Sequence, residues 1–128
     1  MKKIERLPDT ELLVMKAIWN NETPISTSRV KEYLDIERTW NISALQTLLN
    51  RLISRGFLFS EKKGKNRFYE PLISEKEYIA RENRSFLERL NGSSITKFVT
   101  SLYDSKSISN ADLEELADFI EERIKGGE

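Results

Sequence analysis

Apolar residues recur at helical spacing in the first third of the chain and mark two short amphipathic segments. Residues 7–11 are typical of a helix start, with Asp9 or Thr10 near the cap, and the first segment continues to about Asn20. The second follows Ser26 or Thr27, which can cap a helix with one apolar face. We therefore predict two short helices in this part of the chain.

A third amphipathic segment and an aromatic hairpin follow. Asn41 can cap a helix that runs to about Arg55, and Gly56 ends it because glycine readily adopts the left-handed conformation that closes a helix. Its apolar stripe consists of Ile42, Leu45, Leu48, Leu49, Leu52 and Ile53. Residues 57–61 and 67–70 are rich in aromatic side chains and predict two strands joined by a basic turn.

The second half of the chain predicts three further helices. Ser74 begins a Ser-x-x-Glu capping box, which opens a long helix that ends near Leu90. Two more amphipathic stretches follow, over residues 95–103 and 113–124. The expected fold class is mainly α with a small β-hairpin wing: a winged helix-turn-helix followed by a helical dimerisation region.

Composition excludes most kinds of chemistry. The 128 residues include no cysteine and no histidine, so thiol nucleophiles, thiolate metal sites and the commonest general base are absent. No glycine-rich phosphate loop or spaced acidic cluster is present. We therefore expect no enzyme activity, no catalytic residue, no metal and no cofactor. Because the chain has neither an apolar leader nor a run of roughly 20 apolar residues, we expect a cytoplasmic protein that does not insert into a membrane.

The formal net charge of zero conceals an uneven distribution. Residues 1–72 hold 13 Lys and Arg against 9 Asp and Glu, whereas residues 73–128 hold 8 against 12. A basic front half and an acidic back half indicate that only the front half faces phosphate groups. Chance clustering of solvated charges can also produce an imbalance of this size, so the charge alone does not decide the function.

The third predicted helix and the hairpin supply two classes of contact with double-stranded DNA. With its leucines facing inward, the helix turns outward Ser43, Ala44, Gln46, Thr47, Asn50 and Arg51. Such side chains can pair with adenine, pack on the thymine methyl group or reach guanine and phosphate. On an isolated helix they would more often form a plain solvated face, but here they lie between a helix pair and a basic wing. The expected phosphate contacts on the wing are Lys63, Lys65 and Arg67, beside Lys62.

The helical half carries more apolar surface than three short helices can cover on their own. A twofold pair of chains would bury this surface and set two recognition helices about one DNA turn, roughly 34–36 Å, apart. We therefore expect a DNA-binding domain at residues 1–72 and a helical dimerisation domain at residues 73–128. The expected homodimer interface consists of Phe86, Leu90, Phe98, Leu102, Leu113, Leu116, Ile120 and Ile124.

A set of residues spread along the chain stands at a characteristic order and spacing. It comprises Glu11, Val14-Met15, Ile18-Trp19, Trp40, Thr47-Leu48-Leu49, Arg51-Leu52, Arg55-Gly56, Leu58, Arg67, Tyr69, Pro71 and the acidic segment 112–116. In this arrangement the chain resembles the penicillinase repressors, the BlaI/MecI/CopY family of bacterial regulators. The resemblance covers nearly the whole chain. Trp19 lies on the apolar face of the first predicted helix and Trp40 lies just before the third, so we expect both to serve packing rather than base stacking.

The resemblance implies a transcriptional repressor that binds a palindromic operator as a homodimer. In the antibiotic-responsive branch, which the chain resembles most, a membrane sensor metalloprotease signals cleavage of the repressor in its dimerisation region. The signal there is a cell-wall antibiotic or a similar envelope stress. The copper-responsive branch uses a C-terminal cysteine cluster, which this chain lacks.

The chain departs from the family pattern at two places. Ser43, Ala44 and Gln46 stand where the best-known members carry Lys, Thr and Arg, so its operator need not be theirs. The family's scissile Asn-Phe pair falls on Ser101 and Leu102, which form the candidate cleavage site.

Two other functions stay open at this point. One is a ligand-responsive winged-helix regulator whose helical half binds a small molecule, and the other is a helical protein-interaction adaptor with no role in DNA binding. Binding to the chain's own promoter would separate both regulators from the adaptor. Thermal stabilisation by one of a panel of ligands would favour the ligand-responsive regulator.

Overall fold

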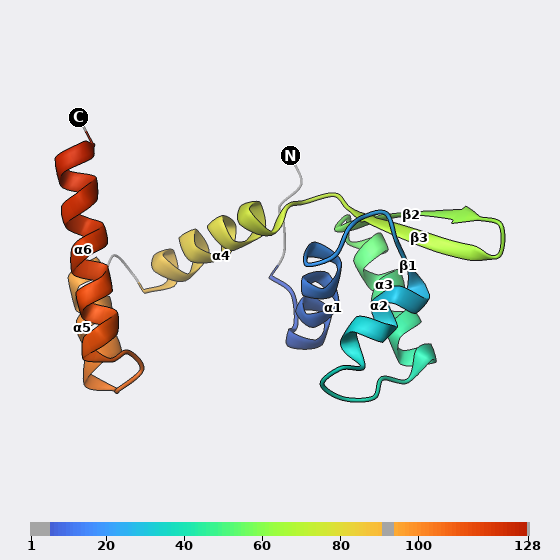
Figure 1. Ribbon diagram of the computed structural model, residues 1–128, viewed down its shortest axis with the longest axis horizontal. Helices are drawn as coiled ribbons and strands as arrows, with labels where there is room; N and C mark the ends of the chain where they lie inside the picture. Colours follow the sequence, from blue (N-terminus) through green and yellow to red (C-terminus); the bar gives the residue numbers. More distant parts are fainter. Residues whose placement is uncertain (1–5, 91–93, 128) are drawn as a thin grey trace. The chain divides into compact units, whose positions relative to one another are not determined.

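The computed structural model describes residues 6–90 and 94–127 (Figure 1). In chain order its elements are α1 (Asp9–Trp19), β1 (Ile25–Ser26), α2 (Thr27–Leu34), α3 (Ile42–Ser54), β2 (Leu58–Lys63), β3 (Asn66–Pro71), α4 (Glu75–Arg89), α5 (Ile95–Asp104) and α6 (Asn110–Gly126). The predicted architecture, mainly α with a small β-hairpin and followed by a helical region, is confirmed. None of the helices in the described ranges combines the length and the apolar character needed to cross a bilayer.

The chain divides into two compact units, Met1–Ser85 and Phe86–Glu128. The core of the first unit lies among α1, α2, α3 and the base of the hairpin, and the distal part of β2 and β3 projects beyond the helices (Figure 1). Among the residues that the structure describes, seventeen apolar side chains are buried there, and the largest that are fully enclosed are Met15, Ile18, Leu45, Leu49, Leu52 and Leu58. Burial of these side chains from both helices and strands makes the first unit a single packed body.

The strands form one antiparallel sheet in the order β1-β3-β2. β1 supplies a third strand that pairs Ile25 with Tyr69 and Ser26 with Phe68. This short strand covers an edge of β3 that would otherwise leave backbone groups unpaired. At the other end of the hairpin, the pairing of Lys63 with Asn66 leaves only two residues in the turn. The basic turn predicted over five residues is therefore largely strand.

Local sequence signals explain most of the helix starts. Ser26 accepts a hydrogen bond from the backbone N–H of Arg29 at 3.2 Å, and Asn41 accepts one from Ala44 at 3.0 Å, as their predicted capping roles require. The first helix begins at Asp9, which lies near the cap as expected. The cap position itself is Pro8, in an extended conformation and with no side-chain cap. Asp9 lies within the first turn, where a carboxylate is stabilised by the helix dipole.

Side chains from the start of α4 anchor this helix to the first unit. Tyr78 is buried, its hydroxyl accepts a hydrogen bond from the N–H of Leu7 at 2.8 Å, and its ring contacts those of Trp19 and Phe57. Burial raises the pKa of the Tyr78 hydroxyl, since the charged form loses its hydration. The indole of Trp19 donates to the carbonyl of Ile73 at 2.9 Å.

These contacts explain why the compact unit reaches Ser85. The boundary that we place between residues 72 and 73 concerns the part of the chain that suffices for DNA binding. It stays a prediction, because packing of α4 on the winged helix does not decide which residues contact DNA.

An ion pair between a buried carboxylate and a partly exposed arginine connects α1 to the C-terminal end of α3. The carboxylate of Glu11 is 2% exposed and accepts a hydrogen bond from Nη1 of Arg55 at 2.8 Å. Arg55 is the C-cap residue of α3, and Gly56 follows it with a φ of 85°. A buried carboxylate without its cation costs several kcal/mol, so this pair constrains where α3 ends relative to α1.

We predict that Arg55→Met lowers the free energy of unfolding by about 2–3 kcal/mol, because it leaves Glu11 buried without a partner. Urea unfolding of the full chain measures this effect. Arg51→Met is the matched control, since Arg51 lies on the same last turn but is exposed, and we expect a change within about 0.5 kcal/mol. The double variant Glu11→Leu/Arg55→Met should recover most of the loss. Equal effects of the two single arginine variants would contradict the constraint.

Candidate DNA interface

The reading face of α3 is set by the residues that it buries. Leu45, Leu49 and Leu52 are fully buried, and their spacing places them on one side of the helix. The six α3 residues selected from the sequence lie on the opposite surface and are all exposed: Ser43, Ala44, Gln46, Thr47, Asn50 and Arg51. The leucine stripe therefore predicted correctly which side chains point outward.

Grooves flank this exposed surface on both sides. A groove of about 640 Å³, here called the wing groove, lies between α2, the start of α3 and the hairpin, and its lining includes Thr27, Ser28, Ile42, Gln46, Lys62, Lys65 and Arg67. A second hollow of about 470 Å³ shares Gln46 and Arg67 with it and adds Asn50. On the other side, a groove of about 410 Å³ is lined by residues that include Arg38, Trp40, Ala44, Thr47 and Arg51.

Five of the six selected α3 residues therefore fall into two groups. Gln46 and Asn50 face the hairpin, whereas Ala44, Thr47 and Arg51 face the turn between α2 and α3. The hydroxyl of Thr47 donates to the carbonyl of Ser43 at 3.1 Å, so its remaining hydrogen-bonding capacity is that of an acceptor.

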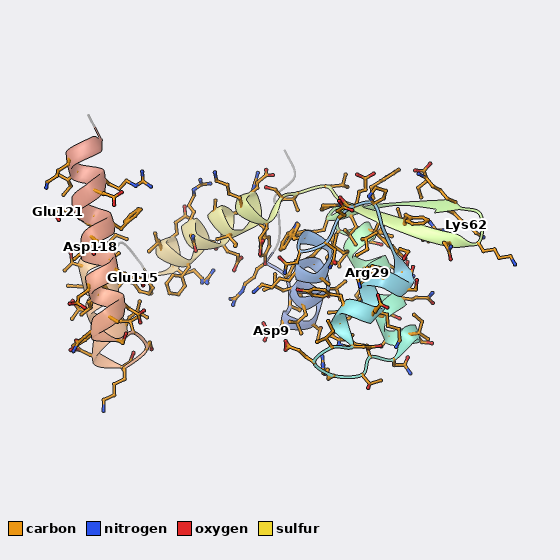
Figure 2. The ribbon with its side chains drawn as sticks, in the orientation of Figure 1. Asp9, Arg29, Lys62, Glu115, Asp118 and Glu121 are labelled. Carbon is orange, nitrogen blue, oxygen red and sulfur yellow. The ribbon has the colours of Figure 1, made fainter. Side chains whose placement is uncertain are left out.

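The hairpin register decides which basic side chains face α3. Lys62 and Arg67 are directly paired across β2 and β3, so they lie on the same face of the hairpin, and both line the wing groove with Lys65. Lys63 follows Lys62 in β2, and side chains alternate between the two faces of a strand. Lys63 accordingly does not line the wing groove, and its role as a phosphate contact stays a prediction. Figure 2 shows Lys62 on the outer part of the hairpin.

The cations around the wing groove differ in how far they are neutralised. On α2, Arg29 pairs with Glu32 and Lys31 pairs with Asp35, each with an N to O distance of 2.6 Å (Arg29 is labelled in Figure 2). Lys62, Lys65 and Arg67 form no ion pair within residues 6–90 and 94–127. Among the cations around the wing groove, those of the hairpin are therefore free to meet phosphate. On the other side of α3, the exposed Arg51 also forms no ion pair in the described part of the chain.

Asp35 organises the turn between α2 and α3. Its carboxylate accepts hydrogen bonds from Nζ of Lys31 at 2.6 Å and from the backbone N–H of Trp40 at 2.8 Å. These two bonds, the Lys31 bond first, lower the pKa of Asp35 below its ordinary value. Trp40 is buried, and the guanidinium of Arg38 lies 4.6 Å from the centroid of its ring. Both tryptophans thus serve packing, as expected.

Two features of this surface were not selected from the sequence. The N-terminal turn of α2 contributes Thr27 and Ser28 to the wing groove, and the cap at Ser26 was the signal that could have indicated it. The second feature is a correction. Ile42 was assigned to the inward stripe, but its side chain is 44% exposed and lines the wing groove. It is the first residue of α3, and the buried part of the stripe begins one turn later at Leu45.

Comparison with known proteins identifies the family. The family model described as penicillinase repressor matches residues 7–122. The chain belongs to this family. It is 36% identical over 122 residues to a penicillinase repressor of Bacillus licheniformis, with 95% of this chain and 94% of the relative covered. It is 22% identical over 121 residues to the methicillin resistance regulatory protein MecI of Staphylococcus aureus strain N315, with 94% and 98% covered.

Two solved structures resemble the chain in its fold. One is the solution structure of the DNA-binding domain of the repressor BlaI, with 42% identity, a TM-score of 0.53, and coverage of 61% of this chain and 94% of that one. The other is the monomeric form of B. licheniformis BlaI in complex with the blaP half-operator, with 42% identity, a TM-score of 0.50 and the same coverage. These two structures confirm the winged helix-turn-helix expected from the sequence.

We predict that base-reading and phosphate-contacting residues respond differently to substitution. Gln46→Ala should cost about 1–3 kcal/mol on the preferred duplex and relax specificity, because an amide that pairs with a base edge is lost. Lys62→Ala should weaken preferred and scrambled duplexes alike and reduce the slope of log affinity against log salt by about one. Titrations of both duplexes at several salt concentrations measure these effects.

Lys63→Ala is the matched comparison for Lys62→Ala, since the two lysines are adjacent but lie on opposite faces of β2. We expect Lys63→Ala to change the slope of log affinity against log salt less than Lys62→Ala does. An equal change would show that lysines on both faces of the hairpin contact phosphate. An unchanged preference for the selected duplex in Gln46→Ala would show that the assignment of base reading to this residue is wrong.

Proposed function

We propose that this chain is a cytoplasmic transcriptional repressor that binds a palindromic operator as a homodimer. Its release follows cleavage in the helical region, in response to a cell-wall antibiotic or a similar envelope signal relayed by a membrane sensor metalloprotease. The observation that carries the proposal is the exposed polar face of α3 beside a hairpin whose cations have no acidic partner in the described part of the chain. The half-operator complex of the B. licheniformis relative supports DNA as the partner.

The dimensions of α3 suit the major groove of B-DNA. A helix with its side chains is about 10–12 Å across, and the groove is about 12 Å wide. With α3 in the groove, Gln46 and Asn50 would face base edges on the side of the hairpin, and Thr47 and Arg51 would face the other side. Lys62, Lys65 and Arg67 would then neutralise phosphates and displace counterions. Occupancy of an operator that overlaps a promoter would exclude RNA polymerase.

The second unit supports assembly as a homodimer. Neither α5 nor α6 has a buried residue, although both carry apolar side chains at helical spacing. Ile120 is 46% exposed and Ile124 is 71% exposed, while Phe98, Leu102, Leu113 and Leu116 are half-buried. Such a surface on a soluble helical unit favours a partner of the same kind, and an identical copy offers a matching apolar face.

We predict that the full chain is a dimer at micromolar concentration and that Ile120→Glu makes it monomeric, because the new carboxylate would lie in the apolar interface. Sedimentation equilibrium measures the mass. Ala111→Glu adds the same charge to an exposed position in the first turn of α6 and should leave the dimer intact. Circular dichroism of Ile120→Glu should match that of the wild type, since this side chain is already exposed in the single chain. A monomeric wild type would contradict the proposed assembly.

The candidate cleavage site lies within α5. Ser101 is exposed, and its hydroxyl donates to the carbonyl of Phe98 at 2.8 Å, whereas Leu102 is half-buried. The peptide bond between them is in helical conformation, so a protease would need local opening of α5 before it could cut. A cut here would separate α6 from Phe98 and Val99, and the dimer would lose the contacts that depend on both helices.

We predict that cutting after Ser101 weakens binding to the full palindrome and leaves binding to a half-site unchanged. No residue of the first unit is removed, but the gain from tethering two winged helices is lost. The test places an engineered protease site after Ser101 and measures both duplexes before and after cutting. Equal affinity of the cut and intact proteins for the palindrome would refute the claim that tethering contributes to binding. Normal induction of a Leu102→Gly variant in cells would refute only the claim that natural cleavage occurs between Ser101 and Leu102.

A further inference from the structure

We propose that Ile42 is a specificity-determining residue that packs on the methyl group of a thymine in the operator, close to the base contacted by Gln46. The inference rests on the proposed function, because it assumes that α3 enters the major groove of DNA. It adds a branched aliphatic side chain to a reading face on which the sequence indicated only the methyl groups of Ala44 and Thr47 as apolar contacts.

Ile42 is an apolar side chain in a polar groove. It is the first residue of α3, it is 44% exposed, and it shares the wing groove with Gln46, Thr27, Lys62 and Lys65. It does not belong to the core cluster or to the partly buried residues that pack against it. Because Leu45 and Leu49 are fully buried without it, Ile42 is not needed to close the core.

The chemistry of the major groove offers one kind of partner for such a side chain. The base edges there present hydrogen-bond donors and acceptors, and the C5 methyl group of thymine is the apolar feature among them. Phosphate gives an isoleucine no favourable contact. A branched aliphatic side chain at this position therefore distinguishes thymine from cytosine, which lacks the methyl group.

The position of Gln46 predicts where that thymine lies. Ile42 and Gln46 are four residues apart and both line the wing groove, so they share one side of α3. Four residues rise about 6 Å along a helix, which corresponds to roughly two base-pair steps of 3.4 Å. An amide such as Gln46 pairs bidentately with adenine. The pair Ile42 and Gln46 would thus select a thymine and an adenine within two steps of each other.

The test removes one methyl group at a time from the DNA. A preferred duplex is first selected from a random pool with the full-length chain, and each thymine is then replaced by deoxyuridine, which keeps the base pairing. We expect one replacement to weaken binding of the wild type about fourfold, the value of one buried methyl-sized group. For Ile42→Ala the same replacement should change affinity by less than about 1.5-fold, since the contact is already absent.

Two control variants separate this contact from general effects. Ile36→Ala removes an isoleucine that is 77% exposed between α2 and α3 and does not line the wing groove, so it should keep the full sensitivity to deoxyuridine. Gln46→Ala should keep that sensitivity too, while losing the preference for adenine nearby. Alanine is a better helix former than isoleucine. Weaker DNA binding by Ile42→Ala is therefore not explained by unfolding of α3.

The outcomes distinguish the inference from the function on which it rests. A selected duplex with one methyl-sensitive thymine whose effect disappears in Ile42→Ala confirms the contact. A selected duplex whose thymines all tolerate deoxyuridine, or in which every sensitive thymine stays sensitive in Ile42→Ala, overturns the inference and leaves operator binding intact. If selection returns no preferred duplex, sequence-specific binding itself is contradicted, and the role of Ile42 falls with it.

Discussion

Burial of the leucine face of α3 is the constraint on which the rest of the first unit depends. Once Leu45, Leu49 and Leu52 are buried, the helical period determines which side chains of α3 face outward. The ion pair between Glu11 and Arg55 then fixes the end of α3 against α1. The candidate reading face is thus a consequence of core packing and of one ion pair with a buried carboxylate, and it requires no flexible loop to form it.

Local signals made much of the fold predictable, and non-local contacts account for what was missed. The caps at Ser26 and Asn41 act within a few residues, so the sequence contains all that determines them. By contrast, pairing of β1 with β3 joins segments more than forty residues apart. The bond from Leu7 to Tyr78 spans 71 positions, and no periodicity indicates it.

The candidate site shows the same division between local and tertiary information. The outward residues of α3 followed from its leucine spacing, because a helix repeats regularly. Ile42 fits the same spacing, but it lies beyond the end of the core, and only the tertiary packing reveals its exposure. On the hairpin, composition identified the basic cluster, whereas the register with a two-residue turn decided that Lys62 and not Lys63 lines the wing groove.

The two units differ in the kind of side chain that they leave exposed: cations in the first unit and apolar residues in the second. In the first unit, the cations of α2 form ion pairs with Glu32 and Asp35, whereas the wing cations and Arg51 of α3 form none in the described part of the chain. In the second unit α6 has no buried residue and its apolar side chains are exposed or half-buried, and on the proposed function a second copy covers them. On the proposed function, each winged helix binds a half-site weakly, and tethering through the second unit supplies the remaining affinity. A single cut in α5 would then act on operator occupancy without touching any residue that contacts DNA, because it removes the tether and leaves the reading face folded.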